Sequence, residues 1–458
     1  MTQMALLIVV LLTAAAFLTA RSRATMAAGG DYASLHSRPG YHGLYSALWV
    51  GLTGFAVIFV IALLGAALIE SRLMGAIFEA EPTLSNIQAE LILSDAIALA
   101  SGDIASQSDA LRLSLSERYA SMENMRLWAV LLLGVGAAAG ALLLTQKQIA
   151  VEWRARNRSE RIIVYVLLAS AIIAILTTIG IVLSLIGETL NFFGKIDWRV
   201  FDYLFGLNWS PLSGVQAGSM DPEKVGAIPL FAGTMMITLI AMLVATPIGL
   251  LAAIYLSDFA SPRVRGVAKP MLEILAGIPT VVYGFFAALT VGPFIRGAGE
   301  SIGLTVASES ALAAGIVMGI MIIPFISSLS DDVINSVPQS LRDGSYGLGA
   351  TKAETIRQVV LPAALPGVVS AVLLGVSRAI GETMIVVMAA GQGANLTANP
   401  LEAVTTVTVQ IVMLITGDTD AATASGPAFT LGFTLFCVTL GLNFVALRIV
   451  RRYREMYD

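Results

Sequence analysis

Long apolar runs separated by short polar stretches dominate this chain. A helix that crosses the hydrocarbon core of a bilayer needs roughly 20 mostly apolar residues. Nine runs reach or approach that length. They are residues 4–20, 48–69, 127–145, 162–186, 230–256, 272–295, 311–329, 366–391 and 429–449. The pattern predicts an all-α, polytopic membrane helix bundle.

Composition supports this interpretation and narrows the chemistry. Hydrophobic residues make up 57% of the chain and charged residues 13%, where soluble proteins average about 45–50% and about 25%. A soluble globular enzyme is therefore excluded. The single cysteine, Cys437, lies in an apolar run, so neither an internal disulfide nor a cysteine cluster for a metal is expected. His36 and His42 are interpreted as solvated loop histidines, and we expect no catalytic or metal-binding residue.

The placement of Arg and Lys predicts the orientation. Cytoplasmic loops of membrane proteins carry an excess of basic residues. With the N-terminus outside and the C-terminus in the cytoplasm, the inside loops are the basic ones. Since the positive charges follow the first apolar run instead of preceding it, that run is interpreted as a retained anchor. The inside residues are Arg21, Arg23, Arg38, Lys147, Arg154, Arg156, Arg158, Arg161, Arg263, Arg265, Lys269, Arg342, Lys352, Arg357, Arg451, Arg452 and Arg454.

Three segments outside the spans invite specific predictions. Residues 71–126 form a net-acidic outside insertion, in which we expect a small helical hairpin that serves packing or docking, or else sensing or partner recognition. Residues 188–229 are rich in aromatic residues, typical of an interfacial belt or of a contact for a periplasmic binding protein. Residues 404–415 are apolar but too short to span, so they favour a surface-lying helix or a gate.

Residues 331–365 form a polar loop between two spans. Ser336 can cap a helix whose first turn holds Pro338. Gly349 follows where a helix end favours a left-handed residue. The stretch 351–354 reads as a capping box that starts a second helix, running to Leu361 and Pro362. A helix, a glycine corner and a helix facing water predict a loop that is held by a partner outside the membrane.

No Walker A motif is present in the sequence. The pair Gly194-Lys195 is followed by Ile196 and lacks the required glycine spacing. The chain itself therefore cannot supply ATP hydrolysis, which must come from a partner acting on the loop.

Arg378 and Glu382 lie within the run 366–391. An arginine at the centre of a membrane helix costs at least about 2.5–3.5 kcal/mol, so it faces a cavity or a partner. The spacing i, i+4 places both side chains on one helix face, where they can form an ion pair. The pair is either structural or part of an anion passage, since a guanidinium matches oxyanions bidentately. Two further stretches, 246–249 and 277–279, contain Pro and Gly and are expected to break their spans.

The loop and the motif after it carry a resemblance. Asp343-Gly344-Ser345, Gly349, Val359, Leu361 and Pro362 fall in the register of the Glu-Ala-Ala loop of ABC importer permeases, with Asp-Gly-Ser in place of Glu-Ala-Ala and Val in place of Ile. The stretch Arg378-Ala-Ile-Gly-Glu382-Thr383-Met384 resembles phosphate-specific (Pst) permeases of the C type. Residues 162–458 are covered by this resemblance, and residues 1–161 lie outside it.

The resemblance implies a fold, a function and partners. It implies a type I ABC importer permease core of six spans in residues 162–458, preceded by an N-terminal extension with three spans. It further implies phosphate import across the bacterial inner membrane. The expected partners are a second (A-type) permease, a pair of ATP-binding subunits, a periplasmic phosphate-binding protein and membrane lipid; this chain is expected to bind no cofactor and no nucleic acid. The implied docking residues are Asp343, Gly344, Ser345, Gly349, Ala350, Thr351, Glu354, Leu361 and Pro362, and the implied pathway residues are Arg378, Glu382 and Thr383.

Three alternatives remain open on the sequence. The permease could serve another oxyanion, such as molybdate or sulfate. A secondary transporter would need no ATPase, but its inverted repeat of broken helices is not visible and the loop would have no role. A membrane scaffold for phosphate signalling could use the same partners without transport.

Overall fold

The computed structural model describes residues 1–29, 35–82, 84–102, 109–213, 221–417 and 421–454. Within these residues the chain is helical, with one isolated bridge between Trp209 and Val225. The chain divides into two compact units, Met1–Leu176 and Thr177–Asp458. The division falls within α5 (Ala155–Lys195), later than the boundary at 161 expected from the sequence.

The described residues contain nine helices that are long and apolar enough to cross a membrane. This confirms the number of spans expected from the hydrophobic runs. The candidate spans are Thr2–Ala27, Pro39–Ala80, Ala110–Lys147, Ala155–Lys195, Ile228–Phe259, Thr280–Ser301, Ala311–Ser336, Lys352–Ile380 and Ala424–Arg448.

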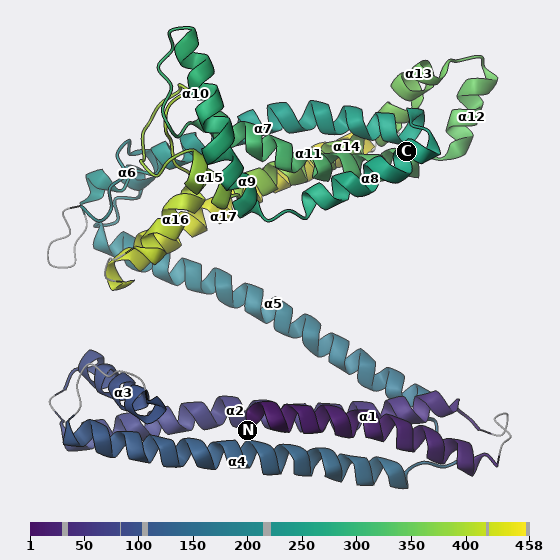
Figure 1. Cartoon of the computed structure of the whole chain (residues 1–458), viewed down its shortest axis with the longest axis vertical. Helices are drawn as coiled ribbons and strands as arrows, with labels where there is room; N and C mark the ends of the chain where they lie inside the picture. Colours follow the sequence, from purple (N-terminus) through teal and green to yellow (C-terminus); the bar gives the residue numbers. More distant parts are fainter. Residues whose placement is uncertain (30–34, 83, 103–108, 214–220, 418–420, 455–458) are drawn as a thin grey trace. The chain divides into compact units, whose positions relative to one another are not determined.

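Three long helices build the first unit and lie side by side (Figure 1). Small residues let them approach closely: a Cβ on Gly54 would lie 2.7 Å from Val9 and 3.1 Å from Ala138. Membrane helices associate through such packing because lipid supplies no hydrophobic drive between them. His42, expected in a solvated loop, is instead buried within the second of these helices. The three are α1 (Thr2–Ala27), α2 (Pro39–Ala80) and α4 (Ala110–Lys147).

The expected outside insertion, residues 71–126, is helical as predicted, but it is not a separate hairpin. α2 and α4 both extend into it, and α3 (Asn86–Ser101) packs against these extensions. The buried side chain of Arg112 donates to Asp95 at 2.8 Å and joins α4 to α3. Residues 83 and 103–108 of the insertion lie outside the described residues.

The second unit is built around α11 (Ala311–Ser336), the helix with the longest buried face, which packs along α7 (Ile228–Ile254). A Cβ on Gly319 would lie 2.9 Å from the carbonyl oxygen of Ala241, so the two backbones are in near contact. α14 (Leu361–Ile380) packs on the same pair, and α9 packs on α11. Figure 1 shows α7, α11 and α14 running together.

The bounds of the other helical elements in this unit are as follows. They are α6 (Val200–Phe205), η2 (Pro222–Lys224), η3 (Tyr255–Phe259), α8 (Pro262–Ala276), α9 (Thr280–Phe286), η4 (Ala287–Val291), α10 (Gly292–Ser301), α12 (Gln339–Gly347), α13 (Lys352–Thr355), η5 (Ile356–Val360), α15 (Met384–Ala389), α16 (Val407–Thr416) and α17 (Ala421–Arg454).

The expected breaks in the spans have different outcomes. The break at 277–279 is confirmed, because α8 ends at Ala276 and α9 begins at Thr280. The expected break at 246–249 is wrong, since Pro247 lies inside a continuous α7. A membrane helix with packed neighbours tolerates the loss of one backbone hydrogen bond.

The span expected over residues 366–391 is not one helix. α14 ends at Ile380, and α15 begins at Met384 after a non-helical step. The short apolar stretch at 404–415 does form a short helix, α16, as predicted.

The aromatic segment at 188–229 splits between the core and the surface. Tyr203 is fully buried and its hydroxyl lies 2.9 Å from that of Thr434, while the buried Trp209 donates to Gln410 at 3.1 Å. Trp198, Phe201 and Phe205 are exposed. The interfacial-belt and docking interpretations therefore remain available only for the exposed three.

Candidate functional site

The polar loop at 331–365 begins differently from the sequence prediction. α11 continues to Ser336, whose hydroxyl donates to the carbonyl of Val333 at 2.7 Å, so Ser336 caps no following helix. Pro338 takes the N-cap position of α12 without a side-chain bond. After α12, Gly349 has φ +87°, which confirms the predicted left-handed corner.

The second helix of the loop starts as predicted but does not end there. Thr351 and Glu354 form the expected capping box: the Thr351 hydroxyl accepts from the Glu354 amide at 3.4 Å, and the Glu354 carboxylate accepts from the Thr351 amide at 2.8 Å. The helix then passes through the π-helical η5 into α14, so the expected end at Leu361 and Pro362 is wrong. Pro362 directly follows the π-helical turn η5 and stands at the start of α14.

The loop presents apolar side chains at its surface. Leu348 is 91% exposed, and Leu341 and Tyr346 are exposed beside it on the same loop. The hydroxyl groups of Ser345 and Thr355 lie 2.8 Å apart and join its two helices. Of the predicted docking residues, Asp343, Gly344, Gly349, Thr351 and Glu354 are exposed, and Ser345, Ala350, Leu361 and Pro362 are half-buried.

Arg342 fixes α12 to the rest of the unit. It is the one buried residue of this helix, and its guanidinium forms an ion pair with Asp258 in η3. The same guanidinium donates to the carbonyl oxygen of Ile334 at 2.8 Å. Both charged side chains are almost fully enclosed, with exposed fractions of 9% and 7%. The exposed loop thus has a buried ionic attachment to the end of α7.

A second buried carboxylate, Asp331, connects α8 to the end of α11. Asp331 is 2% exposed and accepts from Lys269 at 2.7 Å and from Arg265 at 3.1 Å. The hydrogen bond to Asp331 raises the pKa of Lys269. Together with the Arg342–Asp258 pair, this contact joins the ends of α7, α8, α11 and α12 at the base of the loop.

These two ion-pair contacts could not be predicted from the sequence. Arg342 and Asp258 are 84 residues apart, and Lys269 and Asp331 are 62 apart. In the sequence, these basic residues indicate only the cytoplasmic side. Charges at the ends of apolar runs are the one available signal, and they do not say which carboxylate meets which base.

The predicted pairing of Arg378 with Glu382 is wrong. The chain leaves the helix after Ile380, so the two residues do not share a helix face. Glu382 instead accepts from the amides of Met384 and Ile385 at 3.0 and 3.4 Å, because the first turn of α15 presents unpaired donors. Its own carbonyl accepts from the Thr408 hydroxyl at 3.0 Å. Glu382 therefore holds the non-helical step to the start of α16.

Arg378 is exposed in the last turn of α14. Its guanidinium carbon lies 5.7 Å from the centre of the Phe325 ring, and no ion pair joins it to another part of the described chain. On the preceding residue, the Ser377 hydroxyl donates to Asn443 of α17 at 3.1 Å. Thr383 is the N-cap residue of α15, with no side-chain cap. The three predicted pathway residues thus lie at one break, and neither Arg378 nor Glu382 has an ion-pair partner in the part of the chain that the structure describes.

Two family models match this chain. One is described as a phosphate ATP-binding cassette transporter and matches residues 6–177. The other is described as a binding-protein-dependent transport system inner membrane component and matches residues 245–455.

Relatives decide the family. The chain is 34% identical over 283 residues to the probable ABC transporter permease protein YqgH of Bacillus subtilis. The aligned region covers 62% of this chain and 87% of that protein. The chain is also 30% identical to the phosphate transport system permease protein PstC of Mesorhizobium japonicum, over 62% of this chain and 86% of that protein. The chain belongs to the phosphate-transport branch of the ABC transporter permeases.

This assignment agrees with the helical bundle described above. The first matched region of the permease, residues 6–177, ends at the division between its two structural units, although residues before 162 lay outside the resemblance seen in the sequence. Members of the family are transport components and not enzymes. A crystal structure of a bacterial alginate ABC transporter in complex with its alginate pentasaccharide-bound periplasmic protein is 17% identical, with a TM-score of 0.46, over 65% of this chain and 96% of that one.

Proposed function

We propose that this permease is the transmembrane subunit of an ATP-driven importer that moves inorganic phosphate across the bacterial inner membrane. The observation that carries the proposal is the similarity, over most of their length, to relatives named as phosphate transport system permeases. ATP is hydrolysed by a separate subunit, and this chain holds no cofactor.

The loop of α12 and α13 is the proposed docking site for the ATP-binding subunit. Leu348, Leu341 and Tyr346 give it an apolar surface that a partner can cover, which is uncommon for a loop that faces water alone. The exposed residues Asp343, Gly344, Gly349, Thr351 and Glu354 surround that surface. Because Arg342 anchors α12 to Asp258, movement of a docked partner is passed to the end of α7.

The substrate pathway is proposed at the break between α14 and α15. Arg378 offers an exposed guanidinium, which stays charged at any working pH and matches phosphate oxygens bidentately. Glu382 and Thr383 shape the break and do not neutralise that charge. A second, A-type permease facing this side completes the pathway, and a periplasmic phosphate-binding protein delivers the anion.

The proposed topology places the N-terminus and residues 71–126 outside, and the loop and the C-terminus in the cytoplasm. Single cysteines at exposed Ser94 on α3 and Ser340 on α12, in a Cys437→Ser background, test it. An impermeant thiol reagent added to intact spheroplasts should label the first and not the second. The opposite labelling would reverse the orientation.

Phosphate uptake tests the function. Cells that lack their own phosphate importer should take up radiolabelled phosphate when this chain is expressed with its partner subunits, and should not when it is omitted. Inhibition by molybdate or sulfate at equimolar concentration would favour a different oxyanion. Co-purification of a second permease and an ATPase would exclude a secondary transporter. If they co-purify but no phosphate is taken up, the result would favour a scaffold for phosphate signalling.

A further inference from the structure

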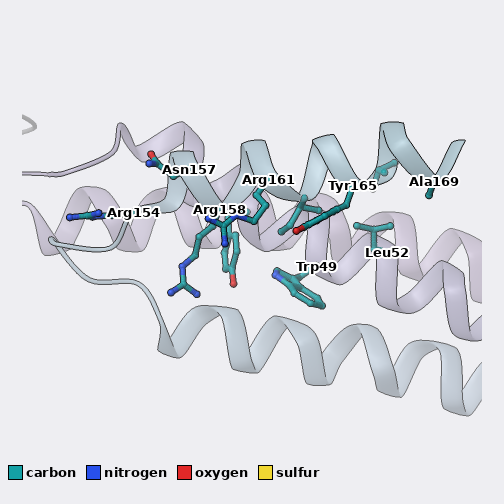
Figure 2. Close-up of a pocket in the computed structure, with 11 residues that line it drawn as sticks. Trp49, Leu52, Arg154, Asn157, Arg158, Arg161, Tyr165 and Ala169 are labelled. Atoms are coloured by element: carbon teal, nitrogen blue, oxygen red, sulfur yellow. The ribbon is translucent and has the colours of Figure 1, made fainter. Parts of the chain in front are cut away.

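A cavity of about 800 Å³ lies within the first unit, between α2 and the first turns of α5. Figure 2 shows its lining side chains, with Arg154, Asn157, Arg158 and Arg161 towards one end and Tyr165 and Ala169 further along α5. Neither the docking loop nor the pathway break contributes to it. The cavity is therefore lined by residues other than those proposed for docking and for the substrate pathway.

Each wall of the cavity is one helix face. Arg158, Arg161, Tyr165 and Ala169 follow each other at spacings of three or four residues, which places them on the same side of α5. On α2, Tyr45, Trp49 and Leu52 repeat the same spacing. Along both faces the lining residues change from polar to apolar, from Arg158 to Ala169 on α5 and from Tyr45 to Leu52 on α2.

The polar end carries positive charge that no carboxylate neutralises. Arg154, Arg158 and Arg161 are exposed and take part in no ion pair within the described residues. Arg156, on another side of α5, pairs with Glu160 at 2.7 Å and does not line the cavity.

Aromatic contacts position the central arginine. The guanidinium of Arg158 lies 4.1 Å from the ring centre of Trp153. Trp153 in turn meets Tyr45 edge-on at 6.0 Å, and the Tyr45 hydroxyl donates to Gln148 at 3.1 Å. The Arg158 cation is thus held by a ring that packs on the lining residue Tyr45, and its hydrogen-bond donors remain available.

The apolar end continues along the helices. From Arg154 to Ala169 the wall extends about 22 Å at 1.5 Å per residue. Half the hydrocarbon core of a bilayer is about 15 Å. Tyr165 and Trp49 are 62% and 42% exposed in the cavity region, so a long apolar ligand would bury surface that the protein leaves open.

We propose that this cavity binds one anionic membrane phospholipid. Its phosphate contacts Arg154, Arg158 and Arg161, and an acyl chain lies against Leu52, Tyr165 and Ala169. Free inorganic phosphate shares the anionic group but makes no use of the apolar wall. If the three arginines served only to orient the protein in the membrane, they would not need to line the same cavity. Basic pockets between membrane helices, in contrast, bind lipid headgroups.

Lipid retention by the full-length chain tests the proposal. The chain is reconstituted in nanodiscs of equal phosphatidylglycerol and phosphatidylcholine, then extracted in mild detergent, and the retained lipids are quantified by mass spectrometry. The wild type should retain phosphatidylglycerol preferentially. Arg158→Gln with Arg161→Gln should lower that preference by about fivefold for each arginine.

The control removes the same number of charges nearby. Arg156→Gln with Lys147→Gln should keep the wild-type preference, because neither residue lines the cavity. The proposal is overturned if both double variants lose the phosphatidylglycerol preference equally, or if Arg158→Gln with Arg161→Gln does not lose it. If the first double does not accumulate, Arg161→Gln is compared with Arg156→Gln alone. Arginine-dependent binding of inorganic phosphate by calorimetry in phosphatidylcholine nanodiscs, without lipid preference, would assign the site to a free anion and overturn it as well.

Discussion

The buried pair of Arg342 and Asp258 makes a sharp prediction about the docking loop. Arg342→Ala removes the only buried side chain of α12 and leaves the Asp258 carboxylate, 7% exposed, without its cation. Breaking a buried pair on one side costs about 3–5 kcal/mol. The lost hydrogen bond to Ile334 adds about 1 kcal/mol. The cost falls on the attachment of α12, because the membrane core of the unit lies elsewhere.

Hydrogen exchange on the purified chain measures this effect. A local cost of about 4–6 kcal/mol in total corresponds to a loss of protection of about 700-fold to 20,000-fold. We expect that loss, up to the limit of the protection present, in residues 334–347, with the core of α11 unchanged. Co-purification of the ATP-binding subunit should fall in parallel. Arg357→Ala is the matched control, since Arg357 is exposed on the same loop.

The double variant separates an uncompensated charge from a lost contact. Asp258→Ala together with Arg342→Ala removes both charges and should recover a large part of the protection lost in Arg342→Ala. Unchanged exchange in Arg342→Ala, or equal loss with Arg357→Ala, would refute the assignment of Arg342 as the anchor of α12.

Two further predictions concern the corner and the pathway. Gly349→Val places a β-branched residue at φ +87°, at a cost of about 1–2 kcal/mol. It should insert normally but lose ATPase coupling, whereas Gly347→Ala, with open space at its Cβ and outside the predicted docking residues, should not; equal coupling in the two would contradict the corner's role. Arg378→Gln should keep wild-type membrane abundance yet abolish phosphate uptake, also when combined with Glu382→Gln. Uptake near wild type in that double would remove Arg378 from the pathway.

The spans were predictable because each apolar run is long enough to decide the outcome by itself. The glycine corner and the capping box were predictable for a similar reason: φ at Gly349 and the Thr351–Glu354 contacts depend on residues within a few positions. The resemblance added the family, which similarity to named permeases confirms.

The features that could not be predicted from the sequence depend on tertiary contacts or on competition between nearby hydrogen-bonding groups. The interval from Gly381 to Thr383 lies inside the long apolar run at 366–391, so hydropathy alone does not reveal the break. Glu382 there bonds amides two and three residues ahead in preference to an arginine one turn behind. The Arg342–Asp258 contact arises only when α12 folds back on the end of α7.

The length of α2 has a consequence for how the first unit responds to temperature. Its 42 residues extend about 63 Å, about twice the hydrocarbon thickness of a bilayer. One core along it, around Val50 and Ile58, lies within the apolar run at 48–69, and a second, around Leu73 and Leu115, lies beyond that run. With the run at 48–69 in the membrane, α2 extends from lipid into water. Cooling weakens apolar association in water, but packing between helices in lipid does not depend on that effect. Cooling should therefore weaken the packing of α3 against α2 and α4 while the packing of α2 against α1 and α4 is retained.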